Sequence, residues 1–402
     1  MKLLKQLFIK IFLLSSIILS CRNSNTQNKG PLITFDLKEL PELTDVKLSD
    51  LGFVDIEYIP LETNERCLIT GSDDLITGNK IIVGNGFFLV QHYTTILKFN
   101  NDGSFETRIG TVGNGPGEFR VAHDVDFNTE GHNIYLVSAW QKKFNVYSES
   151  GEFKRTFQMP LYAPVDFRFV DGNILCYCEN HMGNIENSYT LLDTNGQVIK
   201  SFPNRYPFKN HDAFGFPREN LFYRFNNRLF KKEVYSDTIY LYKNMDFKPH
   251  LVIESGEKLI TPDARSKYDG MYIAENFISQ LKLFEFGDYV YYEFIYKFAL
   301  PDDVLIYSFI GSKKNNFRAL INTGQGIFND LDGGQNIIPK TIKDDNTIIA
   351  WIDPLKLKAH VDSEVFKNST PKYPEKKKEL ERLANSLKET DNPVLVLVKL
   401  KI

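Results

Sequence analysis

The feature that most constrains the fold is a hairpin-like pattern that recurs along the chain. Gly103, Gly151 and Gly196 are 48 and 45 residues apart, and each lies in a turn between two runs of alternating apolar and polar residues. Such alternation is typical of β-strands, and a turn glycine tolerates the positive φ that tight hairpins need. A repeat of this length with paired strands predicts a β-propeller, whose blades have four short strands each.

Further apolar runs predict a six-bladed, all-β propeller. The first four blades are expected at 80–83, 87–91, 96–99 and 105–109; at 124–128, 133–138, 144–148 and 152–158; at 165–169, 173–178, 188–193 and 197–202; and at 221–225, 228–232, 238–242 and 250–253. The last two are expected at 288–298, 304–310 and 317–322, and at 327–329, 347–352 and 393–400, with earlier strands at 33–37 and 54–61.

The two ends of the domain are expected to share a blade and so close the ring. The run 394–400 is apolar on both faces, with Val394, Val396 and Val398 on one side and Leu395, Leu397 and Leu400 mostly on the other. A strand so apolar would aggregate as an open edge. We therefore expect it to pair with the strand around 54–58.

Two helical insertions are expected between strands. Thr261-Pro262-Asp263 is a helix-start pattern that predicts an insertion near 261–283, with a helix over 272–283. A second helix is expected at 373–389, where Leu380, Leu383 and Leu387 share one face.

The N-terminus has the pattern of a targeting segment. Lys2, Lys5 and Lys10 precede a short apolar run, which ends at Ile18-Leu19-Ser20-Cys21. This resembles a bacterial lipobox, which implies cleavage of residues 1–20 and lipidation of Cys21. Residues 21–32 then read as the lipidated cysteine and a flexible tether, and 33–402 as the propeller. The alternative is an ordinary secretory signal with a chance cysteine.

Composition excludes some partners. A formal net charge of −3 argues against a nucleic-acid surface, which needs a clustered basic face. Cys67, Cys176 and Cys178 remain after Cys21, and they lack the companion ligands of a metal site, so we expect Cys176 and Cys178 to be buried core residues.

Two passages resemble a known family. They are the run 57–63, EYIPLET, and the run 99–119, which contains the turn at Gly103 and ends in GNGPGEF. Together they resemble the six-bladed β-propeller lipoproteins of Bacteroidetes, relatives of the NHL-repeat propellers. The resemblance implies an outer-membrane lipoprotein that faces the periplasm or the cell surface. It implies no reaction, because no metal-ligand motif of the enzymatic NHL propellers matches.

The glycine-rich stretch 110–119 is expected to be a shaped connection between blades. It lacks the Lys-Ser/Thr of a P-loop and the spacing of a dinucleotide fold. We expect Glu118 to accept backbone N–H bonds within it.

Candidate binding residues fall in two groups. The first, His123, Asp124 and Asp126, begins a blade and should lie at the central channel or its mouth; the second is in a long loop and comprises Tyr206, Phe208, His211, Asp212, Phe214 and Phe216. Flat rings in loops are typical of carbohydrate and peptide sites. No catalytic set and no cofactor are predicted.

The function most consistent with the sequence is a lipid-anchored binding or scaffold module for a glycan, peptide or envelope partner. The alternative is a metal-dependent hydrolase or lyase with its site at the channel mouth.

Overall fold

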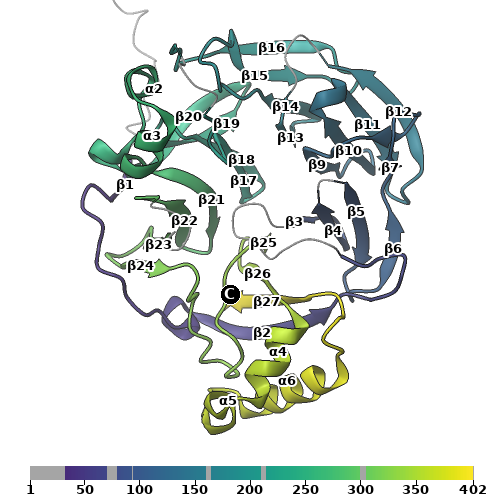
Figure 1. Ribbon diagram of the computed structural model, residues 1–402, viewed down its shortest axis with the longest axis vertical. Coiled ribbons are helices and arrows are strands. Elements are labelled where there is room, and N and C mark those ends of the chain that lie inside the picture. Colours follow the sequence, from purple (N-terminus) through teal and green to yellow (C-terminus); the bar gives the residue numbers. More distant parts are fainter. Residues whose placement is uncertain are drawn as a thin grey trace, which may run out of the picture. The chain divides into compact units, whose positions relative to one another are not determined.

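Six small antiparallel sheets stand in a ring around a common axis, so the predicted six-bladed β-propeller is confirmed (Figure 1). The structure is a computed structural model and describes residues 32–69, 79–92, 94–159, 164–209, 214–298 and 305–401. The ring belongs to the compact unit Thr34–Ile402.

Each of the first three blades is a four-stranded meander. Blade 1 comprises β3 (Lys80–Val83), β4 (Phe87–His92), β5 (Thr95–Asn100) and β6 (Phe105–Arg108); blade 2 comprises β9 (Asp124–Asn128), β10 (Asn133–Ser138), β11 (Lys143–Ser148) and β12 (Phe153–Gln158); blade 3 comprises β13 (Asp166–Val170), β14 (Asn173–Tyr177), β15 (Asn187–Leu192) and β16 (Val198–Pro203).

The fourth and fifth blades follow the same plan, with one added strand. Blade 4 comprises β17 (Asn220–Phe225), β18 (Arg228–Glu233), β19 (Thr238–Lys243) and β20 (Asp246–Glu254), with β1 (Ile33–Asp36) at its outer edge; blade 5 comprises β21 (Ser279–Phe286), β22 (Tyr289–Ile295), β23 (Ile306–Ser312) and β24 (Arg318–Asn322). The turn between β17 and β18 is made by Asn226 and Asn227 with φ of 49° and 54°, as a two-residue hairpin requires.

Blade 6 joins the two ends of the domain, as the sequence predicts. Its order is β2 (Phe53–Pro60), β27 (Val394–Leu400), β26 (Thr347–Ile352) and β25 (Thr341–Asp344). Glu57 of β2 lies opposite Leu397 of β27. The expected alternation of β27 holds for the valines and for Leu395 and Leu397, which enter separate cores, but Leu400 packs with the valines because its spacing from them is even.

Two sequence-based expectations are wrong. The helix expected over 272–283 ends at Asn276, and Ser279–Phe286 is β21, the inner strand of blade 5. This segment pairs with β22 along its whole length, so sheet pairing overrides its helical pattern. In blade 6 the expected strand 327–329 contributes only isolated bridges, Ile327 with Ile337 and Phe328 with Lys47, and the inner strand is the short, polar β25.

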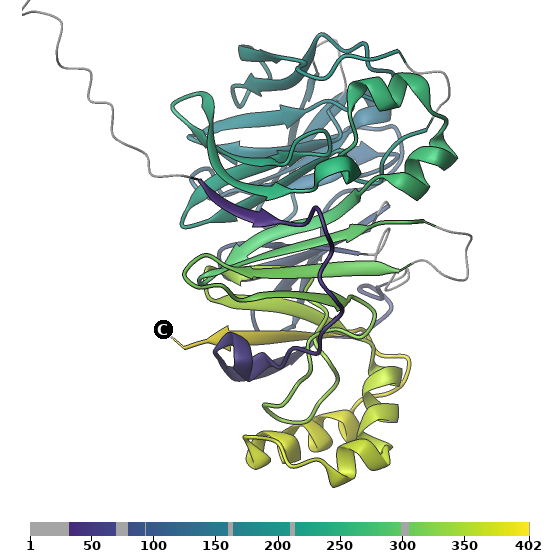
Figure 2. The same cartoon turned by 90° about the vertical axis from the view of Figure 1, so that its left-hand side faces the viewer.

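Short helices and a two-stranded sheet are present in addition to the six blades. They are η1 (Leu48–Leu51), η2 (Ala139–Gln141), η3 (Gly256–Lys258), α2 (Pro262–Lys267), α3 (Gly270–Asn276), α4 (Pro354–Asp362), α5 (Glu364–Asn368), α6 (Pro374–Ser386), β7 (Thr111–Val112) and β8 (Glu118–Phe119). Helices α4 to α6 lie outside blade 6 (Figure 2), where Leu380 and Ala384 of α6 join the core. Within the six described ranges, no helix is long and apolar enough to cross a membrane.

Candidate binding groove

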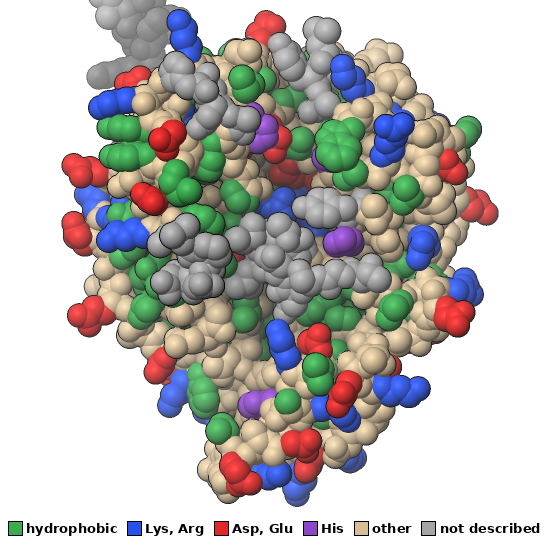
Figure 3. Space-filling view, in the orientation of Figure 1, with side chains coloured by type: hydrophobic (Ala, Val, Ile, Leu, Met, Phe, Trp, Pro, Cys, Tyr) green, Lys and Arg blue, Asp and Glu red, His purple; other side chains and the backbone are tan. Residues whose placement is uncertain are grey.

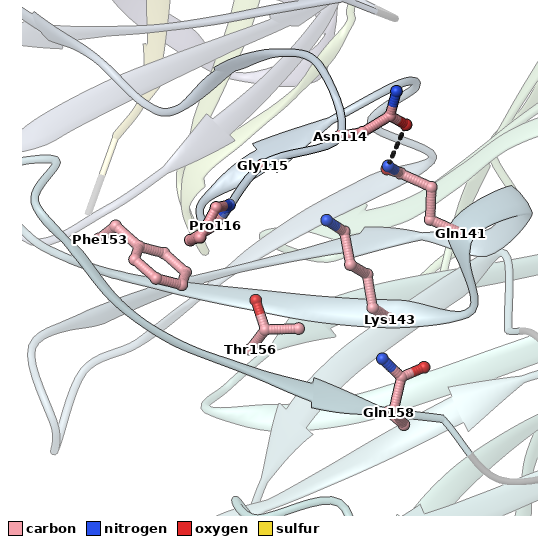
Figure 4. Close-up of a pocket in the computed structure, with 8 residues that line it drawn as sticks. All are labelled: Asn114, Gly115, Pro116, Gln141, Lys143, Phe153, Thr156 and Gln158. Carbon is pink, nitrogen blue, oxygen red and sulfur yellow. Dashed lines mark hydrogen bonds between the residues drawn. The ribbon is translucent and has the colours of Figure 1, made fainter.

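A groove of about 480 Å³ lies between the glycine-rich loop and the outer strands of blade 2 (Figure 4). Its lining residues come from the loop, from η2 and from the strands β11 and β12. They are Asn114, Gly115, Pro116, Gln141, Lys143, Phe153, Thr156 and Gln158.

The loop is held in shape by Glu118. β7 and β8 pair in parallel, which brings the two ends of the loop together. The N–H of Gly115 donates to Oε2 of Glu118 at 2.7 Å, as the sequence predicts for this carboxylate. A Cβ at Gly113 would lie 2.1 Å from the same oxygen, so the loop needs a glycine there for space. The stretch is therefore a shaped connection between blades 1 and 2.

Three polar side chains on one face of β11 tie the loop to blade 2. Lys143 Nζ and Asn145 Nδ2 donate to the carbonyl oxygen of Glu118 at 2.7 and 2.9 Å. The hydroxyl of Tyr147 donates to the carbonyl oxygen of Gly117 at 2.8 Å. These bonds satisfy backbone carbonyls that would otherwise be buried without partners. Lys143 is only 9% exposed, and this burial lowers its pKa.

One end of the groove is fixed by an amide network. Gln141 Oε1 accepts the backbone N–H of Arg120 and the hydroxyl of Ser138, both at 2.8 Å. Its Nε2 donates to the carbonyl of Gly113 at 3.2 Å, and Oδ1 of Asn114 accepts from Arg120 Nε at 2.9 Å. The two amides are thus oriented before any ligand arrives.

The opposite wall comes from β12. Phe153 is 40% exposed and lies over Gly117, where a Cβ would be 2.7 Å from the ring. The hydroxyl of Thr156 donates to Asn145 Oδ1 at 2.7 Å. In Figure 4 the side chains of Phe153, Thr156 and Lys143 point toward the same space below the loop. One ring, several amides and one ammonium can bind a small polar molecule, but they form no nucleophile–base pair.

Asp124 and Asp126, predicted as binding residues, are buried and tie blades together. Asp124 accepts the N–H of Phe167 at 3.0 Å, and Asp126 accepts that of Phe169 at 2.9 Å, so β9 is fastened to β13. Basic side chains of other inner strands complete the cluster. Lys80 and Arg168 pair with Asp124, and Arg224 pairs with Asp126. Figure 3 shows the face of the ring that is also seen in Figure 1, and acidic and basic side chains lie next to each other near its centre.

Asp166 belongs to the same cluster, but its pKa is shifted in the opposite direction from that of Asp124. Burial raises the pKa of Asp166 to about 7, although Arg168 donates to its Oδ1 at 2.9 Å. Burial also acts against ionisation of Asp124, but the charges of Arg168 and Lys80 outweigh it and hold the pKa of Asp124 below its usual range. One carboxyl is therefore ionised at neutral pH while the other is poised to titrate.

His123, the third predicted residue of this group, packs at the start of β9. Its Nδ1 accepts the N–H of Ala139 at 3.1 Å, and its ring meets Trp140 edge to face at 5.4 Å. Burial lowers the pKa of His123, which favours the neutral ring.

The predicted aromatic residues of the long loop form a small core of their own. Tyr206, Phe208, Phe214 and Phe216 pack with Tyr235, and Phe208 and Phe216 are 8% and 4% exposed. The buried guanidinium of Arg265 lies over three of these rings, 4.8 Å from Phe208, 5.4 Å from Phe214 and 5.3 Å from Phe216. A ligand that stacks on them would have to displace Arg265, and ligand binding here stays a prediction.

Some predicted residues lie outside the described ranges, namely Cys21, His211 and Asp212. Within those ranges, no three His, Cys, Asp or Glu side chains gather as metal ligands, and the metal-dependent hydrolase or lyase stays a prediction. Cys67, Cys176 and Cys178 are buried, as expected for the last two, and burial raises the pKa of each thiol.

The groove itself was not predicted from the sequence, although the loop that forms one side of it was. The signal that could have found it is the pattern Lys143, Asn145 and Tyr147, three polar groups on one face of a strand that follows a glycine-rich loop.

Comparisons with known proteins agree with the fold. The family model for "Domain of unknown function (DUF4934)" matches residues 32–399, and no curated protein matches the chain. A Bacteroides fragilis protein described as exported is 19% identical over 92% of this chain and 100% of that chain, with a TM-score of 0.70. A DUF4221 family member from Bacteroides vulgatus is 11% identical over 87% of this chain and 97% of that chain, with a TM-score of 0.52. At these identities the likeness shows the fold alone.

Proposed function

This chain belongs to the family of domains of unknown function DUF4934, and we propose that it is a lipid-anchored binding module of the cell envelope. Its ligand is a small polar molecule held in the groove between the glycine-rich loop and blade 2. The propeller is the rigid scaffold, and the lipid on Cys21 is the anchor.

The observation that carries the proposal is the preorganised lining of the groove. Gln141 is fixed by its bonds to Arg120 and Ser138, and Lys143 by its bond to Glu118. A volume of about 480 Å³ is within the usual range for small-molecule sites, roughly 300–1,000 Å³. Polar groups already oriented before binding lose little conformational entropy when a ligand arrives.

The cell-envelope location is supported by the export of a structural relative and by the lipobox-like Cys21. The similar Bacteroides fragilis protein is described as exported. The sequence Ile18-Leu19-Ser20-Cys21 fits lipidation. Several acyl chains on one residue would give stable anchoring.

Trp140 provides a fluorescence test of the groove. It adjoins Gln141 and is 74% exposed, whereas Trp351, the other tryptophan, is 8% exposed. Full-length protein would be titrated with panels of oligosaccharides and short peptides while the tryptophan emission is recorded. We expect at least one panel member to change the emission saturably, and Phe153→Ala to weaken that binding at least tenfold. Binding that Phe153→Ala leaves intact, or no saturable binding from either panel, would refute the proposed function.

A further inference from the structure

The groove carries one charged group, and that group is basic. Of its eight lining residues only Lys143 is ionisable, and none is a carboxylate. The nearby carboxylate of Glu118 is turned onto the N–H of Gly115 and packs where a Cβ of Gly113 would be. An anion in the groove would therefore meet an ammonium without facing a carboxylate of the lining.

The charge of Lys143 is only partly offset by the protein, because the nearby Glu118 carboxylate acts on it through space and raises its pKa less than burial lowers it. Its ammonium donates to the carbonyl oxygen of Glu118, a neutral acceptor. Within the described part of the chain it forms no ion pair. An ammonium has three donors, so it can bind a ligand while it keeps the bond to the loop. Burial lowers the pKa of Lys143, and an anionic ligand would offset that cost of burial.

The rest of the lining suits a ring that bears hydroxyl groups. Phe153 offers an exposed aromatic face, which can cover the apolar C–H face of a sugar. The amides of Asn114, Gln141 and Gln158 and the hydroxyl of Thr156 are groups that both donate and accept hydrogen bonds. Such groups match neighbouring hydroxyls, each of which also donates and accepts.

Other anions fit less well. The N–H groups of Gly113 and Gly115 are occupied by Phe119 O and by Glu118, so they do not form a phosphate cradle. A nucleic acid would need several basic contacts along its backbone, and the lining supplies one.

We propose that the groove binds an acidic saccharide, with a pyranose ring on Phe153 and the carboxylate of the sugar on Lys143. This deepens the proposed function and rests on it. The loop positions the ammonium through Glu118, and the amides on the two sides bind the ring hydroxyls. The acidic group supplies the selectivity.

Calorimetric titration of the full-length protein tests the proposal. The probes are oligosaccharides that end in galacturonate, glucuronate or sialic acid, each beside its neutral counterpart, and an Asp/Glu-rich peptide. We expect at least one acidic saccharide to bind about tenfold or more tightly than its counterpart, because hydrogen bonds to charged groups are the strong ones. The affinity should fall as the pH rises and Lys143 loses its proton.

Lys143→Gln is the decisive variant, because glutamine keeps a donor for Glu118 but has no charge. It should remove the preference for the acidic saccharide, so that the acidic saccharide and its neutral counterpart bind with equal affinity. Its thermal midpoint should not fall, because a buried charge is removed. Lys154→Gln is the matched control: Lys154 lies on the neighbouring strand β12 but is exposed and bonds to Asn133, so its replacement should leave the preference intact.

Three outcomes would overturn the acidic-saccharide proposal and leave the binding function standing, provided that Phe153→Ala still weakens binding at least tenfold. These are equal affinity for acidic and neutral saccharides, a preference that survives Lys143→Gln, and binding of the acidic peptide alone. Both proposals would be overturned if Phe153→Ala left binding intact, or if no probe bound saturably.

Discussion

The backbone N–H of Glu62 donates a hydrogen bond to the carbonyl oxygen of Gly103 at 2.9 Å. The Glu62 carboxylate also accepts the N–H of Phe105 at 2.8 Å. The segment that follows β2 of blade 6 is thereby fastened to the β5–β6 turn of blade 1. The two sequence passages that resemble the propeller lipoproteins therefore meet in space, at a second point where the ring is closed.

Replacement of Gly103 tests this contact. Gly103 has φ of +86°, and a Cβ there would lie 2.1 Å from the carbonyl oxygen of Pro60. Gly86 has φ of +88°, and no atom of the described residues lies within 4 Å of its Cβ position. Each change to alanine should cost about 1–2 kcal/mol for the left-handed backbone. Gly103→Ala should lose roughly 1–3 kcal/mol more because of the overlap.

Urea denaturation of the two variants measures the difference. The free energy of unfolding should fall further in Gly103→Ala than in Gly86→Ala. Equal losses of unfolding free energy would mean that the structure accommodates the Cβ added by Gly103→Ala beside the Pro60 carbonyl at no cost. The contact between Pro60 and Gly103 would then not hold blades 1 and 6 together.

Much of the fold could be predicted because propeller blades repeat local patterns. Hairpin turns and alternating runs are encoded within each blade, and the apolar run of β27 pointed to ring closure. β21 could not be assigned because its apolar residues follow a helix-start pattern, and pairing with β22 decides its structure. β25 is short and polar, with no fully buried residue, so it leaves no apolar signal.

The candidate site was harder to predict because it depends on contacts between blade 2 and the loop before it. Asp124 and Asp126 could be picked out as polar residues on an inner strand, but their bonds to the backbone of β13 depend on how neighbouring blades pack. Likewise, the bond from Lys143 to Glu118 joins residues 25 positions apart. Sequence patterns indicate that such polar groups are unusual, but not what they face.

The carboxyl of Asp166 should make stability depend on pH. Its pKa rises from 3.8 to about 7 on folding, so the folded state binds this proton more tightly than the unfolded state. Its contribution is therefore complete below about pH 4 and is lost as the pH rises through about 7. Asp166→Asn, which is always neutral, should become more stable relative to the wild type across this window.

Denaturation midpoints from pH 4.5 to 8.5 give the readout as a difference between the two proteins. Glu152→Gln, which removes the same charge at an exposed position, is the control and should show no such trend. A constant difference between Asp166→Asn and the wild type would contradict a raised pKa.

Removal of the Cys21 thiol should release the protein from membranes. Cys21→Ser cannot accept a diacylglyceryl group, so the unmodified protein should leave the membrane fraction and take up no labelled fatty acid. Wild-type protein that takes up no label, together with a membrane-bound variant, would exclude lipidation at this residue.

Deletion of 393–402 should give insoluble protein. β27 lies between β26 and β2, and six of its seven residues are buried. Each buried apolar side chain contributes about 1.5–3 kcal/mol, so the six together rival the net stability of a whole domain, about 5–15 kcal/mol. The deletion would also expose the paired edges of both neighbouring strands, which promotes aggregation.

Leu395→Ala is the graded counterpart of this deletion, because it leaves the backbone pairing intact. Leu395 is fully buried in the core shared with blade 1, so its truncation should cost about 2–5 kcal/mol. Shortening of the polar stretch 23–29, which precedes the ring, should not change the denaturation midpoint. A soluble deletion variant that melts at the wild-type temperature would show that β27 is dispensable and that the ring is not closed through it.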